Sequence, residues 1–101
     1  MATCTWIRYE LGVYAHGTDW NPVPGLYIFA GLNREGRWFP LYVGQAESLA
    51  ARIPNHERWP EAQRHGATHV HAMVVQQPAS RDSIEAELIQ TFQPRLNAQL
   101  R

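Results

Sequence analysis

Two neighbouring glutamates near the C-terminal end of the chain occupy different positions on the helix that we expect over residues 80–92. At about 100° per residue, Glu85 falls in the middle of an apolar face, whereas Glu87 points toward solvent. That apolar face is formed by four side chains, those of Ile84, Leu88, Ile89 and Phe92. A carboxylate placed there is unfavourable unless it is paired or holds a cation. Glu85 is therefore either a cation ligand or one half of a capping box whose N-cap is Asp82.

An arginine and a histidine stand four residues apart in a second helical stretch, over residues 48–65. On one helix, Arg52 and His56 would lie one turn above each other, with about 5–6 Å between their Cβ atoms. They share their face with three apolar residues, Leu49, Ile53 and Trp59. Taken alone, the pair is most simply explained by polar side chains that lie along the edge of a core.

Two tyrosines and two further histidines are weaker candidates. Tyr27 and Tyr42 lie on two expected strands joined by a hairpin, and they share a sheet face if the register allows it. Two buried tyrosines ordinarily serve packing. His69 and His71 project from the same side of a later strand, but without a cysteine or a clear carboxylate they make a poor zinc site.

The elements that must position these residues follow from apolar periodicity and from the breakers. We expect a half-exposed strand over residues 3–14, a loop over 16–24 and a hairpin over 25–44. These are followed by a helical stretch over 48–65, a strand over 68–75 and a helix over 80–92. Pro40 favours an edge strand or a bulge. Pro54 and Pro60 should kink the helical stretch or break it into two short pieces. Ser48 is expected to be its N-cap, and Pro78 is expected in a loop. This order predicts an α+β fold with a small, mostly antiparallel three-stranded sheet, which the N-terminal strand can extend, flanked by helices.

Composition sets the class of protein. A chain of 101 residues with 45% apolar residues predicts a single domain, residues 1–101, with a real core. The single cysteine, Cys4, excludes an internal disulfide and a multi-cysteine zinc site. The sequence contains no apolar run of membrane-spanning length and no secretory signal, so we expect a cytoplasmic protein without a membrane partner.

The charge balance argues against indiscriminate coating of nucleic acid. Nine cationic residues, all of them arginine, balance nine acidic residues. Nucleic-acid-binding proteins are usually basic, because neutralised phosphates supply most of their non-specific affinity. A neutral total still permits a basic face, since charges can segregate in three dimensions.

Taken in order along the chain, these features resemble the GIY-YIG nuclease family. The resemblance rests on Gly25-Leu26-Tyr27, Tyr42-Val43-Gly44, the stretch from Ser48 through Arg52 to His56, Glu85-Ala86-Glu87-Leu88-Ile89, and Pro94-Arg95-Leu96-Asn97. It covers residues 24–97, about three-quarters of the chain. No single triplet is specific, but the ordered set is.

The resemblance implies hydrolysis of a DNA phosphodiester bond with one divalent cation, Mg²⁺ or Mn²⁺. Tyr27 would be the general base for the attacking water, and Tyr42 would help to position the water or the phosphate. Arg52 would stabilise charge on the scissile phosphate, and His56 would assist at a phosphate oxygen. Glu85 would be the protein's ligand to the cation, while Glu87 remains a solvated charge.

Further positions of the motifs carry secondary roles. Gly44 would leave room for close approach of the substrate, and Gln45 stands where many members have lysine, so a phosphate contact there would be neutral. Pro94 and Asn97 would close the fold. A tyrosine with an ordinary pKa near 10 is a poor base, and we expect Arg52 and the cation to lower its pKa.

Two functions from different classes are consistent with these residues. The first is a metal-dependent DNA endonuclease, favoured by the complete set of candidate catalytic residues, with specificity from a homodimer or an accessory protein. The alternative is a nucleic-acid-binding or protein-interaction module with weak or lost catalysis, favoured by the neutral charge.

Overall fold

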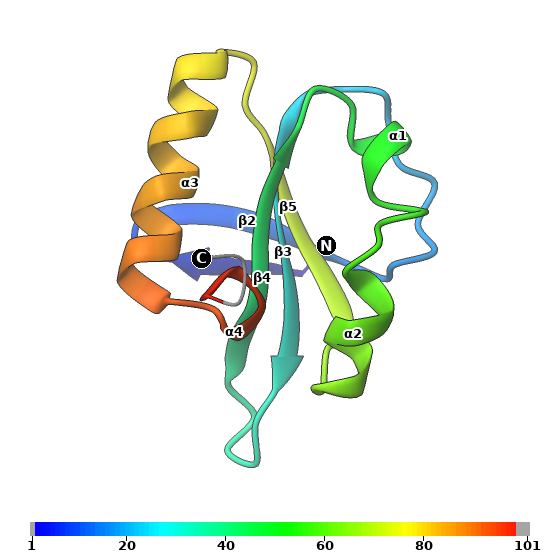
Figure 1. The fold of residues 1–101 in the computed structure, drawn as a ribbon, viewed down its shortest axis with the longest axis vertical. Coiled ribbons are helices and arrows are strands. Elements are labelled where there is room, and N and C mark those ends of the chain that lie inside the picture. Colours follow the sequence, from blue (N-terminus) through cyan, green and yellow to red (C-terminus); the bar gives the residue numbers. More distant parts are fainter. Residues whose placement is uncertain (1, 99–101) are drawn as a thin grey trace.

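A five-stranded antiparallel sheet forms the centre of the computed structural model, which describes residues 2–98. The strands are ordered β1-β2-β5-β3-β4, with helices on both sides of the sheet (Figure 1). The strands are β1 Thr3–Trp6, β2 Tyr9–Tyr14, β3 Gly25–Leu32, β4 Trp38–Ala46 and β5 His69–Val74. The helices are α1 Leu49–Arg52, α2 Trp59–Arg64, α3 Pro78–Phe92 and α4 Arg95–Ala98. The α+β class is confirmed, but the expected number of three strands is wrong.

The two additional strands come from residues 3–14, which form a hairpin and not one strand. Trp6 pairs with Tyr9, so the chain reverses at Ile7 and Arg8. Ile7 adopts a left-handed φ of 61°, which is uncommon for a β-branched residue. The alternation of side chains continues through the reversal, so the pattern alone does not mark the turn. β2 then pairs with β5 and joins the hairpin to the sheet.

Strand β4 lies at the edge of the sheet and contains an irregularity at Pro40. The register shifts between Phe29 and Ala30, which pair with Tyr42 and Pro40, respectively. Pro40 has no N–H to contribute to a ladder, so an edge strand with a bulge accommodates it. The expectation of an edge strand or a bulge is confirmed in both respects.

Part of the open edge of β4 is covered by α4. The side chain of Asn97 accepts a hydrogen bond from the Val43 N–H at 2.7 Å and donates to the Val43 carbonyl at 2.9 Å. Pro94 and Leu96 are buried beside it. Asn97 thus binds the backbone of β4 as a neighbouring strand would, and the role expected for Pro94 and Asn97 in closing the fold is confirmed.

The helical stretch after β4 divides into two short helices, as the prolines predicted. Ser48 caps α1, since its hydroxyl accepts from the Ala51 N–H at 3.2 Å. α1 ends at Arg52, and a turn that contains Pro54 leads to Trp59, where α2 begins. No helix in residues 2–98 is long and apolar enough to cross a membrane.

Helix α3 begins two residues earlier than expected. Pro78 is its first residue and not part of a loop, because proline is well suited to the first helical turn, where its missing N–H would have no partner. The helix ends at Phe92, and Gln93 follows with a left-handed φ of 46°.

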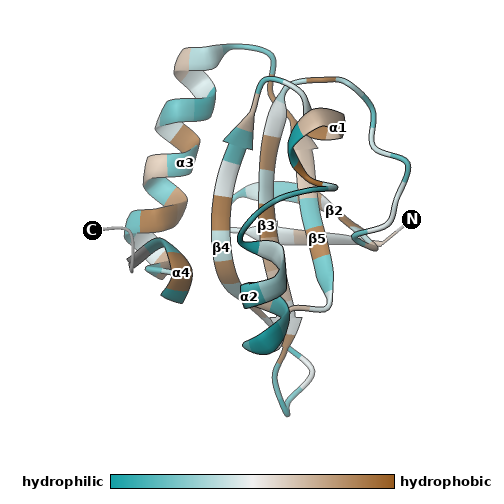
Figure 2. Ribbon diagram, turned by 45° about the vertical axis from the view of Figure 1, so that its right-hand side comes forward, coloured by the Kyte–Doolittle hydropathy of each residue, from teal (hydrophilic) through white to brown (hydrophobic). Residues whose placement is uncertain are grey.

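Two apolar layers cover the two faces of the sheet. Figure 2 shows the brown, apolar stretches of β3 and β4 between α3 on one side and α1 and α2 on the other. Tyr27 and Phe29 belong to the layer under α1 and α2, whereas Ile28 and Ala30 belong to the layer under α3. The side chains of β3 thus alternate between the two layers, and this alternation places Tyr27 under the short helices.

Candidate active site

The two motif tyrosines lie on the same face of the β3–β4 hairpin. Tyr42 pairs with Phe29, two residues beyond Tyr27, so all three rings project to one side. The ring centroids of Tyr27 and Tyr42 are 6.4 Å apart, and His56 packs edge-on to both rings. The shared face that we expected for the tyrosines is confirmed.

Gly44 makes room for Tyr27. It lies directly opposite Tyr27 in the register of β3 and β4. A Cβ at position 44 would lie 2.5 Å from both Cζ and the hydroxyl oxygen of Tyr27, closer than any real contact of this kind. The tyrosine ring leans across the glycine, and any larger residue there would displace it.

His56 donates a hydrogen bond to Tyr27. Its Nδ1 accepts from the Arg58 backbone N–H at 3.0 Å, so Nδ1 carries no proton. The neutral ring must then hold its proton on Nε2, which lies 2.8 Å from the Tyr27 hydroxyl oxygen. Burial lowers the pKa of His56 to about 4, so the ring is neutral at pH 7. The Tyr27 oxygen therefore accepts from His56 and has its own proton free to donate elsewhere.

The position of His56 differs from the one expected. α1 ends at Arg52, so Arg52 and His56 do not share a helix face. The turn after Ile53 brings His56 back over the sheet, where it is 3% exposed. Both ring nitrogens are bonded to protein groups in this structure, Nε2 to the Tyr27 hydroxyl and Nδ1 to the Arg58 N–H.

Both tyrosines are more difficult to deprotonate than expected. Burial is the main cause that raises the pKa of Tyr27, followed by the neighbouring Tyr42. The Arg52 charge lowers this pKa, but burial outweighs it. Burial likewise raises the pKa of Tyr42. The Glu85 charge contributes to both increases, which places that carboxylate within electrostatic reach of the pair.

Arg52 is held by a neighbouring carboxylate. Its two terminal nitrogens lie 2.9 and 2.8 Å from the two carboxylate oxygens of Glu57. This bidentate bond raises the pKa of Arg52 and lowers that of Glu57 to about 2. The side chains are 40% and 62% exposed, so solvent screens the pair and a phosphate can replace Glu57 at low cost.

Glu85 lies beside the end of β4 and does not belong to a capping box. Asp82 is the fifth residue of α3, inside the helix, so it cannot be its N-cap. The Gln45 side-chain nitrogen lies 3.0 Å from Glu85 Oε1 and 2.7 Å from Asp82 Oδ1. Arg81 contacts the other end of the same amide. Arg81 and Asp82 stand four and three residues before Glu85, a spacing that could have indicated their shared helix face.

Glu87 is not the solvated charge that we expected. Its carboxylate accepts hydrogen bonds from Arg8 at 2.9 and 3.0 Å and from the Tyr9 hydroxyl at 2.5 Å. These bonds tie the N-terminal hairpin to α3. Periodicity correctly predicted that Glu87 points away from Glu85, but it could not reveal this partner from the other end of the chain.

The donor set around Glu85 fits a hard divalent cation. Carboxylate oxygens are the preferred ligands of Mg²⁺, which usually keeps several waters and takes only one or two carboxylates from the protein. Within residues 2–98, no group of three or more His, Cys, Asp or Glu side chains converges to hold a metal. Glu85 thus suits Mg²⁺ or Mn²⁺ better than Zn²⁺, which prefers four nitrogen and sulfur ligands.

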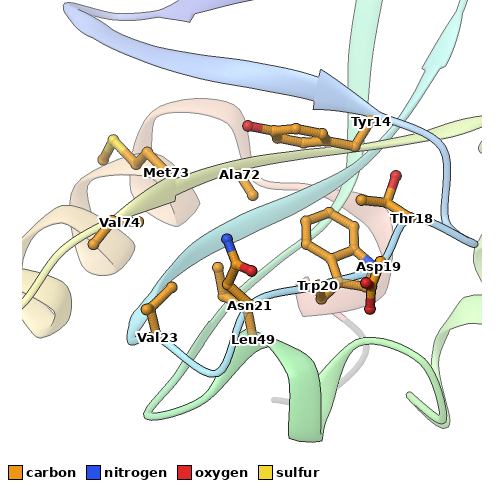
Figure 3. A pocket seen from close by; sticks show the side chains of 10 residues that line it. All are labelled: Tyr14, Thr18, Asp19, Trp20, Asn21, Val23, Leu49, Ala72, Met73 and Val74. Carbon is orange, nitrogen blue, oxygen red and sulfur yellow. The ribbon is translucent and has the colours of Figure 1, made fainter.

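Two hollows flank the first short helix. One, of about 140 Å³, is lined by Tyr14, Thr18, Asp19, Trp20, Asn21, Val23, Leu49, Ala72, Met73 and Val74 (Figure 3). It contains none of the candidate catalytic residues. The other is open, about 440 Å³, and lies between the end of β4 and α1, lined by Gln45, Ala46, Glu47, Ser48, Ala51 and Arg52. The second hollow is lined by Arg52 and by Gln45, whose side chain is bonded to Glu85.

His69 and His71 are not part of this site. His71 is fully buried, its Nδ1 accepts from the Trp6 indole N–H at 2.9 Å, and Trp38 packs edge-on to it. Its Nε2 has no hydrogen-bond partner among the described residues. Burial lowers the pKa of His71 to about 4, as it does for His56.

The two buried histidines predict acid-sensitive stability. Their pKa values near 4 lie below the ordinary value of about 6.5, so the unfolded chain takes up protons first as the pH falls. Stability is full above about pH 6.5 and decreases as the pH approaches 4, by at most on the order of 3 kcal/mol for each histidine. Urea unfolding followed by tryptophan fluorescence at pH 7, 6, 5 and 4.5 measures this loss. His71→Gln keeps an acceptor for Trp6 and should remove about half of this pH-dependent loss of stability. If the free energy of unfolding falls equally steeply with pH in the two proteins, His71 does not contribute to the loss.

Comparison with known proteins identifies the fold. No protein-family model matches the sequence, and a search of curated proteins gives no match. The magnesium-bound GIY-YIG N-terminal endonuclease domain of UvrC from Thermotoga maritima has a TM-score of 0.60 and 25% identity, over 75% of this chain and 84% of that one. An asparagine-to-alanine mutant of that domain, bound to its catalytic divalent cation, has a TM-score of 0.61 and 26% identity, over 75% and 83% of the two chains.

A tyrosine-to-phenylalanine mutant of the same domain gives a similar match, with a TM-score of 0.59 and 27% identity over 75% of this chain and 83% of that one. The fold shared with this endonuclease domain and the ordered motifs of the sequence indicate the same family. With Tyr27, Tyr42 and Gly44 together on one hairpin face and Glu85 near them on α3, the chain belongs to the GIY-YIG nuclease family.

Proposed function

We propose that this protein is a metal-dependent endonuclease that hydrolyses phosphodiester bonds in DNA. The observation that carries the proposal is the convergence of Tyr27, Tyr42 and His56 on one sheet face, within electrostatic reach of Arg52 and Glu85. Solved domains with this fold are endonuclease domains that bind a catalytic divalent cation. These residue types are the ones that water attack on a phosphodiester requires, namely a base, a cation for the developing charge and a metal ligand.

The base of the reaction is Tyr27, assisted by His56. The Tyr27 oxygen accepts from His56 Nε2–H, so its proton faces away from the histidine and its oxygen is held in place. When Tyr27 accepts the proton of the attacking water, it must first be a phenolate, and the His56 N–H stabilises that charge. Tyr42 is only partly buried, in contrast to the buried Tyr27, and positions the water or the phosphate.

Glu85 holds the divalent cation, Mg²⁺ or Mn²⁺. When bound, such a cation polarises the phosphate and lowers the pKa of coordinated water, and its charge also favours the Tyr27 phenolate. Gly44 allows Tyr27 to reach its working position. Gln45 lines the open hollow where the substrate enters.

Arg52 stabilises the charge that grows on the scissile phosphate, after it exchanges Glu57 for a phosphate oxygen. In the free protein Glu57 neutralises Arg52, so part of the DNA-binding charge is masked. The exchange needs no large movement, because both side chains are at the surface.

Plasmid nicking tests the proposed function. Purified protein should convert supercoiled plasmid to the nicked form with Mg²⁺ or Mn²⁺, and a chelator should stop the conversion. Duplex binding without cleavage under all of these conditions would favour the alternative, a nucleic-acid-binding or protein-interaction module. The neutral charge and the strongly buried Tyr27 are the observations that support that alternative.

Removal of the Glu57 charge should strengthen DNA binding. Glu57→Gln keeps the length of the side chain but frees the Arg52 charge and removes a negative charge next to it. Because exposed ion pairs are worth about 1 kcal/mol or less, the gain in affinity should be up to about fivefold. A labelled duplex titrated in Ca²⁺ measures it. Glu61→Gln, which breaks the comparable Arg58–Glu61 pair at 2.6 Å, is the control; an equal gain in both variants would show a general charge effect.

A further inference from the structure

A series of hydrogen bonds connects a buried arginine to Glu85 through Gln45. The Gln45 side chain extends from β4 toward α3, where its Nε2 lies 2.7 Å from Asp82 Oδ1 and 3.0 Å from Glu85 Oε1. Its Oε1 lies 3.4 Å from Arg81 Nε. One amide thus contacts three charged side chains of the same helix.

The orientation of this amide is determined by its neighbours. The amide nitrogen carries two N–H groups and no acceptor, so it can donate once to Asp82 and once to Glu85. The flipped amide would place its oxygen against two carboxylates and its N–H groups against a guanidinium, which has only donors. Both ends of Gln45 therefore favour the same arrangement.

Arg81 is a fixed end of the series. Its side chain is buried, and its Nη1 donates to the carbonyls of Val75 and Gln76 at 3.0 and 3.1 Å. These carbonyls belong to the connection between β5 and α3. Because Arg81 is anchored to the main chain, it cannot turn toward a substrate, and its remaining contact is with Gln45.

We propose that Gln45 is a positioning residue for the cation ligand Glu85, kept in orientation by Arg81. One N–H of Gln45 binds Glu85 Oε1, so Glu85 would hold the cation in a fixed orientation, while the second N–H offsets the repulsion between Asp82 and Glu85. This inference rests on the proposed function and deepens it. It assigns Gln45 to the metal side of the site and not to a direct phosphate contact. Loss of a residue that orients a metal ligand commonly lowers metal affinity or activity by about 10–100-fold.

Manganese binding without DNA tests the inference. Gln45→Met keeps the length of the side chain but removes both N–H donors. Titration of Mn²⁺ followed by electron paramagnetic resonance should give a Kd at least about tenfold higher for this variant than for the wild type. Gln90→Met, the same change at an exposed position of α3, should leave the Kd unchanged. Binding to a labelled duplex in the absence of divalent cations should be equal in all three proteins.

The outcomes separate this inference from the proposed function. If the wild type binds Mn²⁺ but never cleaves DNA, the proposed function fails, and weaker Mn²⁺ binding by Gln45→Met still supports the positioning role. An unchanged Mn²⁺ affinity in Gln45→Met overturns the inference, even in an active nuclease. Thermal unfolding verifies that each variant is folded. If Gln45→Met does not fold, Gln45→Asn, which keeps the amide but is one methylene too short, takes its place with the same expected loss.

Discussion

Glu85→Gln should reduce Mg²⁺-dependent cleavage to background. The substitution keeps the shape of the side chain but replaces the carboxylate charge that would hold the cation with a neutral amide. Within residues 2–98, no group of three or more His, Cys, Asp or Glu side chains converges, so the described residues offer no preformed second metal site. Initial nicking rates of supercoiled plasmid at saturating Mg²⁺ measure the loss.

The matched control for Glu85 is Glu87→Gln, two residues further along the same helix. It weakens the bonds to Arg8 and Tyr9 at the surface, which contribute little to stability. Its cleavage rate should remain close to that of the wild type, with a slightly lower melting temperature. An equal loss of activity in both variants, or an active Glu85→Gln protein, would mean that the cation is held elsewhere.

Tyr27→Phe should lower the cleavage rate at least about a hundredfold, the lower end of the effect of losing a general base. The ring remains, so it still fills the space above Gly44 and packs against Phe29. The hydroxyl that His56 donates to is lost, which leaves a buried N–H without its partner. That unpaired group should cost about 1–3 kcal/mol of stability. Single-turnover nicking and urea unfolding measure the two effects separately.

Tyr9→Phe is the control for the loss of a tyrosine hydroxyl outside the site. Tyr9 bonds to Glu87 on the far side of α3, and its variant should cleave DNA at the wild-type rate. If Tyr27→Phe loses stability but retains its activity, Tyr27 is a packing residue and the tyrosine base must be reassigned.

The local sequence determined much of the frame of the site. The two strands of the hairpin that carries Tyr27 and Tyr42 were predicted, and the proline at position 40 predicted the irregular edge strand. Ser48 marked the start of α1, and helical periodicity separated Glu85 from Glu87. These features depend on backbone preferences and side-chain spacing within a few residues, which are legible in a single sequence.

Only the tertiary structure decided which groups meet. Alternation does not show where a strand reverses, so residues 3–14 form a hairpin that joins β5 and not one strand. The turn after α1 takes His56 away from Arg52 to Tyr27, and Glu57 becomes the partner of Arg52. The Gln45–Glu85 contact joins residues 40 positions apart. Such pairings, and the burial that raises the pKa of Tyr27, arise from the packing of distant segments, which local spacing does not encode.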